Sequence, residues 1–151
     1  MGAVTYPNPE VAAFIAEYFI PVQFNVVEQP EAIDRFNSAW TPTLIVQDAA
    51  GREYRRSLGY LDAPRFLGEM ALGRLMESVH RRDDTAAYER AKDAVRRAKG
   101  DAAREPEALY FEAVAAYKAA HDPARLKEGW ERLMERFPES DWAKKASFIR
   151  G

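Results

Sequence analysis

The sequence contains no cysteine and only two histidines, His80 and His121. Without cysteine the chain cannot form a disulfide, bind zinc through thiolates or use a thiol as a nucleophile. The redox state of its compartment is therefore left open. The two histidines lie in separate segments and no potential ligands surround them at metal-binding spacing. We therefore expect no metal site, no catalytic residue and no cofactor.

Long apolar runs and a strong net charge are also missing. No stretch approaches the roughly 18 apolar residues that a membrane-spanning helix requires, and the formal net charge is −2. We therefore expect no binding to nucleic acid or to a membrane. The first residues do not resemble a signal peptide. This favours the cytoplasm for the chain as written and leaves the periplasm open if the natural N-terminus is longer.

The first half of the chain alternates helix and strand signals. Asn8-Pro9-Glu10 combines a capping side chain with a proline and an acid in the first turn, which indicates a helix start. Residues 22–27 and 43–46 are short apolar or β-branched runs typical of strands. The turn residues 48–51 predict an antiparallel return strand at 52–58. The arginines of that strand indicate an edge or a solvated face. Further helices are expected at about 30–36 and from residue 63.

The second half contains no strand candidate. Helices are expected at about 84–99, 107–120, 123–137 and from residue 141. We therefore place a boundary near residue 80, which gives one domain over 1–79 and a second, helical one over 80–151. Trp130 is expected in the core of the helical part.

Residues 1–79 resemble a thioredoxin-like domain of bacterial type, through the order of the elements, the segment Thr41-Pro42-Thr43 before a strand, and Gly59 before the last helix. The resemblance implies that Pro42 is cis and that its loop contacts substrate backbone. The candidate binding residues are therefore Trp40, Thr41, Pro42 and Thr43. Trp40 is either an exposed contact residue or a side chain packed under the loop.

The chain departs from this family at one important point. Members carry a central strand followed by a Cys-x-x-Cys, and that strand lies between those matched here by 22–27 and 43–47. The expected fold class is thus α/β, an incomplete thioredoxin-like fold with about three strands and no central strand. The two flanking strands would then stand roughly 9–10 Å apart, twice the usual spacing. Three solutions are open: a longer natural protein, direct pairing of the two strands, or a strand inserted by a second copy in a dimer.

The helical part resembles a tetratricopeptide repeat. With the repeat starting at Glu107, its characteristic positions fall on Tyr110, Tyr117, Leu126, Trp130, Leu133 and Pro138. A free-standing stack needs about three units, and this region holds about one and a half. We therefore expect it to pack against the first domain.

Two classes of function follow. The chain is expected to be a relative of thiol–disulfide oxidoreductases that is redox-inactive because it lacks the thiolate. One hypothesis is that it is a truncated form of an active protein. The alternative is a non-enzymatic module that binds a protein or peptide, or a structural homodimer formed by strand exchange.

Overall fold

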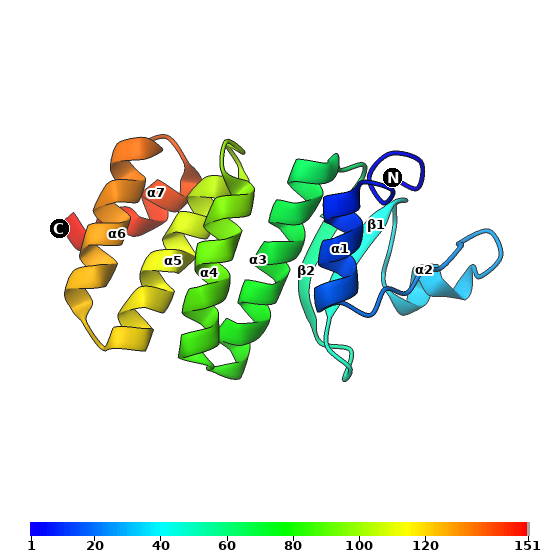
Figure 1. Ribbon diagram of the computed structural model, residues 1–151, viewed down its shortest axis with the longest axis horizontal. Helices are drawn as coiled ribbons and strands as arrows, with labels where there is room; N and C mark the ends of the chain where they lie inside the picture. The colour runs from blue at the N-terminus through cyan, green and yellow to red at the C-terminus, as the bar shows by residue number, and fades with distance from the viewer. Residues whose placement is uncertain (151) are drawn as a thin grey trace.

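The computed structural model describes residues 1–150, which form seven α-helices, one 3-10 helix and one two-stranded sheet (Figure 1). The elements are α1 (Pro9–Tyr18), α2 (Glu31–Arg35), β1 (Thr43–Gln47), β2 (Glu53–Leu58), α3 (Ala63–Arg81), α4 (Asp84–Ala98), α5 (Arg104–Ala120), α6 (Pro123–Arg136), α7 (Asp141–Ala146) and η1 (Ser147–Arg150). The sheet lies toward one end of the molecule, and α3 to α6 stand side by side in a row toward the C-terminus. None of the helices in this described part is long and apolar enough to cross a membrane.

Local signals place most helix starts where the sequence predicts them. The side chain of Asn8 accepts hydrogen bonds from the backbone N–H groups of Glu10 and Val11, which would otherwise lack partners at the start of α1. Asp62 caps α3 and Ser140 caps α7 in the same way. The cap of α4 is Asp83, directly before the start expected at about residue 84.

The two strands form the predicted antiparallel hairpin. Thr43 pairs with Leu58 and Val46 with Arg55, and the register shifts between Val46 and Gln47. The Asp48 carboxylate accepts from the N–H groups of Ala50 and Arg52, which fixes the turn. Because side chains alternate along a strand, β1 presents Leu44 and Val46 to α3 and turns Thr43 and Ile45 to the opposite face.

The strand predicted at 22–27 is not formed, so the prediction of about three strands is wrong. Residues 20–24, which we call the arm, make no backbone–backbone hydrogen bond within residues 1–150. Residues 25–29 form a separate turn, in which Asn25 accepts from the N–H groups of Glu28 and Gln29. A strand is stable only where a neighbouring strand satisfies its backbone groups, and the arm pairs with none here. The fold is mostly helical with a small sheet.

The helix α3 is buried on several sides because it packs against the sheet and against α4. Its residues Leu72 and Leu75 are inaccessible to solvent. They belong to one apolar cluster that also contains Val11 of α1, Val46 of β1 and Ala91 of α4. The core therefore continues across the boundary predicted at residue 80, and the helical part does pack against the first.

A second apolar cluster fills the C-terminal end. Gly129 of α6 lies so close to α5 that an added Cβ would meet the Ala113 Cβ at 2.5 Å. Trp130 is buried, as predicted, and stacks on Tyr110 with 4.8 Å between ring centroids. The start of α5 lies three residues before the predicted one because Asp101 accepts from the N–H groups of Ala103 and Arg104.

Candidate functional site

The loop before β1 has a defined and unusual backbone. The Thr41–Pro42 peptide bond is cis, as predicted. The Thr43 hydroxyl donates to the Trp40 carbonyl at 2.5 Å, and the Ser38 hydroxyl lies 2.9 Å from the Thr43 hydroxyl. At the other side, the Pro42 carbonyl accepts from the Gly59 N–H at 2.8 Å. These bonds attach the loop both to the preceding segment and to the end of β2.

An exposed apolar surface accompanies this loop. Trp40 is 64% exposed, which excludes the alternative that it packs under the loop. Leu58, the last residue of β2, and Tyr60, just after the strand, lie beside the Pro42 end of β1 and are 62% and 56% exposed. Clusters of exposed large apolar side chains are uncommon away from binding surfaces. The structure thus keeps all four predicted residues, 40–43, together at an accessible position.

The outer edge of β1 is open. The alternation of an antiparallel ladder, starting from the bond between Gly59 and Pro42, turns the backbone groups of Leu44 and Val46 toward β2. The N–H and C=O groups of Thr43 and Ile45 therefore point to the other edge. Within residues 1–150 no strand pairs with that edge. Unpaired donors and acceptors of this kind are a template for another strand.

The two edges of the sheet differ in charge. The strand β1 and the preceding loop, residues 40–47, contain no charged residue. The strand β2 carries Glu53, Arg55 and Arg56, and charged side chains on an edge discourage pairing with other chains. The open edge of β1 lacks that protection, which makes it the better candidate for strand binding.

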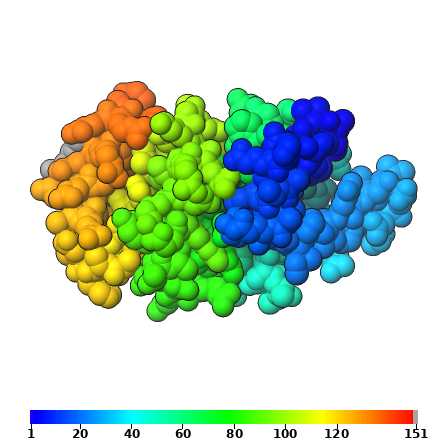
Figure 2. All heavy atoms as spheres, viewed as in Figure 1, coloured from blue at the N-terminus to red at the C-terminus, as the bar shows by residue number. Residues whose placement is uncertain are grey.

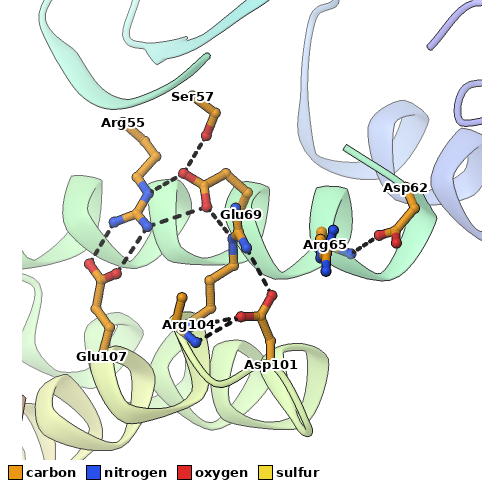
Figure 3. Close-up of polar contacts among 9 residues, drawn as sticks. Arg55, Ser57, Asp62, Arg65, Glu69, Asp101, Arg104 and Glu107 are labelled. Carbon is orange, nitrogen blue, oxygen red and sulfur yellow. Dashed lines mark hydrogen bonds and ion pairs between the residues drawn. The ribbon is translucent and has the colours of Figure 1, made fainter. Parts of the chain in front are cut away.

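A polar network beneath the sheet was not predicted from the sequence (Figure 3). Arg55 donates to Glu69 at 2.7 Å and to Glu107 at 2.5 Å, so one guanidinium joins β2, α3 and α5. Ser57 and Arg104 also donate to the Glu69 carboxylate. The strand β2 is an edge of the sheet, which was one of the two predicted alternatives, but Arg55 itself is turned inward and does not lie on a solvated face.

The electrostatics of the network keep its groups charged. Burial raises the pKa of Glu69, but hydrogen bonds from Arg55 and Ser57 and the nearby positive charges outweigh it, so the pKa lies below its ordinary value. Burial lowers the pKa of Arg55, and the two carboxylates outweigh this and raise it. Every charge has an opposite partner within the protein, so we assign the network to the joining of sheet and helices rather than to binding or catalysis.

A hollow of about 260 Å³ lies between the end of α1, the hairpin, α3 and α4. Most of its charged groups already have partners: Tyr54 donates to Asp48 at 2.8 Å, and Arg90 is paired with Glu77. The Arg74 guanidinium lies 3.4 Å from the centroid of the Tyr18 ring. With these groups satisfied, the hollow offers little to a ligand.

The histidines lie far apart in the sequence and in different surroundings. The His80 ring lies 5.7 Å from that of Tyr54, and His121 ends α5 in the left-handed conformation, with φ of 53°. Among residues 1–150, no group of three or more His, Asp or Glu side chains is placed to hold a metal ion.

Comparison of the chain with protein-family models, curated proteins and solved structures gives no match. The candidate site is therefore defined by its geometry: an exposed cis-proline loop leading into an uncharged, unpaired strand edge.

Proposed function

We propose that this protein binds an extended polypeptide along the open edge of β1, with the Trp40–Thr43 loop at one end of the site. The observation that carries the proposal is the unpaired backbone of Thr43 and Ile45 beside an exposed tryptophan. In this mode of recognition the main-chain hydrogen bonds provide affinity and adjacent side-chain surfaces provide specificity. Trp40 and Leu58 supply such surfaces.

We further propose that the chain is a redox-inactive relative of thioredoxin-like proteins. Support comes from the order helix, cis-proline loop, antiparallel hairpin and helix over the first 81 residues. Disulfide exchange begins with attack by a thiolate, and the chain has no cysteine. The hydroxyls of Ser38 and Thr43 are weak nucleophiles at neutral pH and cannot replace one.

Peptide binding is tested with peptides selected from a random displayed library on the immobilised protein. Their affinity for the wild type is then compared with that for Trp40→Ala. Because exposed tryptophans often dominate such contacts, we expect the affinity of the peptides for Trp40→Ala to be lower by about tenfold or more. Phe148→Ala is the matched control, since Phe148 is 70% exposed and lies in η1 at the C-terminal end of the chain. Equal losses in both variants, or no selectable peptide, would refute the proposal.

The proposal that the chain is redox-inactive is tested by a separate assay. Insulin reduction by dithiothreitol should proceed at the background rate when the protein is added, because no thiolate can relay electrons from dithiothreitol to the insulin disulfides. A clear acceleration would contradict it, and an active thioredoxin serves as the positive control.

A further inference from the structure

We infer that the arm of a second copy of this chain occupies the open edge of β1, so that two copies exchange arms. This inference rests on the proposed function, because it names the polypeptide that the edge binds. Its basis is that one chain carries both an unpaired strand edge and an unpaired, extended, apolar segment.

The arm has the properties of a strand without a partner. It spans five residues, 20–24, the same number as β1. Ile20 is 93% exposed and Val22 71% exposed, while Phe24 is less so because it lies against Phe36, with ring centroids 5.0 Å apart. The three side chains share one face of an extended segment. Exposure of such residues to water is costly unless another surface covers them.

The position of Pro21 determines which backbone side of the arm can pair. Proline has no N–H to donate, so the side that carries the backbone groups of Pro21 and Gln23 is the poorer one. The opposite side presents the N–H and C=O groups of Ile20, Val22 and Phe24. In an antiparallel pairing these groups meet those of Thr43 and Ile45. Val22 then stands opposite Thr43 or Ile45, on the sheet face that carries Leu58.

The charges of the two segments are compatible with this pairing. Charged residues make up 30% of the chain, yet residues 19–27 and 40–47 contain none. No like charges oppose each other across the contact, and no charged group loses its hydration there. The charged edge of β2 offers the arm a less favourable alternative.

The exchange of arms is reciprocal and gives a closed dimer. Each copy gives its arm and receives the partner's, so a two-fold axis relates two identical contacts and no further copies can add. The contact is small compared with standard protein interfaces. We therefore expect a dimer that forms reversibly at high protein concentration.

The cysteine-free chain allows a direct cross-linking test. One preparation carries Val22→Cys, and a second carries either Thr43→Cys or Ile45→Cys. The two are mixed and oxidised mildly, and the disulfide-linked heterodimer is followed on a non-reducing gel. Residues opposite each other in neighbouring antiparallel strands lie about 5.5 Å apart at Cα, a distance that a disulfide spans. We expect at least one of these pairs to cross-link about tenfold faster than Val22→Cys with Glu53→Cys, the control on β2.

Sedimentation equilibrium provides the second measurement. The wild type should form a dimer whose fraction increases with protein concentration. The substitution Val22→Asp changes an exposed position and should raise the dissociation constant of the dimer about tenfold. A wild type that stays monomeric up to about 1 mM, or cross-linking no faster than the control, would overturn the inference. If selected peptides still bind in a Trp40-dependent way, the proposed function survives and only the second copy is wrong as the occupant. If no peptide binds either, both fail.

Discussion

Gly73 of α3 lies so close to Val46 of β1 that a Cβ on the glycine would come within 2.9 Å of the valine Cγ2. This contact sets how near α3 approaches the sheet. It also positions β1, whose other edge is the candidate binding site. The absence of a side chain at residue 73 is thus a packing requirement.

Gly73→Ala should therefore destabilise the protein. Alanine favours a helix by about 1 kcal/mol over glycine, but overpacking against a buried strand typically costs about 1–3 kcal/mol, so we expect a net loss in the free energy of unfolding by urea. Gly68→Ala is the control in the same helix, because its nearest neighbour would be at 3.5 Å, an ordinary contact. Similar effects of the two changes would contradict this account.

Glu69→Gln should be among the most damaging polar changes. The carboxylate is almost fully buried and holds both Arg55 and Arg104. Its neutralisation leaves buried positive charge with one partner fewer, a change that costs about 3–5 kcal/mol in comparable sites. Glu89→Gln breaks the exposed pair with Lys92 and should cost less than about 1 kcal/mol. Urea unfolding of both variants compares the two directly.

The stability should fall in acid, and Glu69 should contribute to the fall. An acid whose pKa is lower in the folded than in the unfolded chain stabilises the fold above its unfolded pKa, and this contribution is lost as the pH falls through the folded pKa. The ordinary values are 4.5 for Glu69 and 3.8 for Asp101, and both are lowered here. Unfolding free energies measured from pH 7 to 3 should decline from about pH 4.5 downward. The decline should be shallower in Glu69→Gln, and an unchanged slope would refute the assignment.

Arg56→Met should loosen α2 without unfolding the protein. Arg56 donates to the Phe36 carbonyl at 2.8 Å and to the Asn37 carbonyl at 3.3 Å, which fastens the end of α2 to β2. Without these bonds, amides at 31–39 should exchange with solvent about tenfold faster, while global stability changes by less than about 1 kcal/mol. Arg65→Met, at an exposed position of α3, is the control and should leave this exchange unchanged.

Helix caps and turns that are determined by neighbouring residues could be predicted from the sequence. The state of the segment 22–27, which depends on a distant partner strand, could not. The cap at Asn8 and the turn at Asp48 are each decided within four residues. The segment 22–27 has the composition of a strand, but a strand also needs an edge to pair with. No local signal shows that this partner is missing.

In the candidate site and the network beneath the sheet, some features could likewise be predicted from the sequence and others could not. The cis bond at Pro42 followed from the resemblance of its loop, and the exposure of Trp40 was one of two alternatives. The network of Arg55 with Glu69 and Glu107 joins positions 14 and 52 residues apart. Its residues look like ordinary surface charges in the sequence, because nothing in their spacing shows that three elements converge on them.

In the space-filling view of Figure 2, the atoms of the N-terminal part (blue) lie directly against those of the green helices. The burial of α3 has a consequence for how the protein unfolds. Residues 66–73 are buried without interruption, because the sheet covers one side of the helix and α4 another. A fragment that ended after residue 82 would expose the apolar side that α4 covers, and one that began there would expose the alanines of α4. Neither half therefore has a complete interior of its own, and the chain should melt in a single cooperative transition.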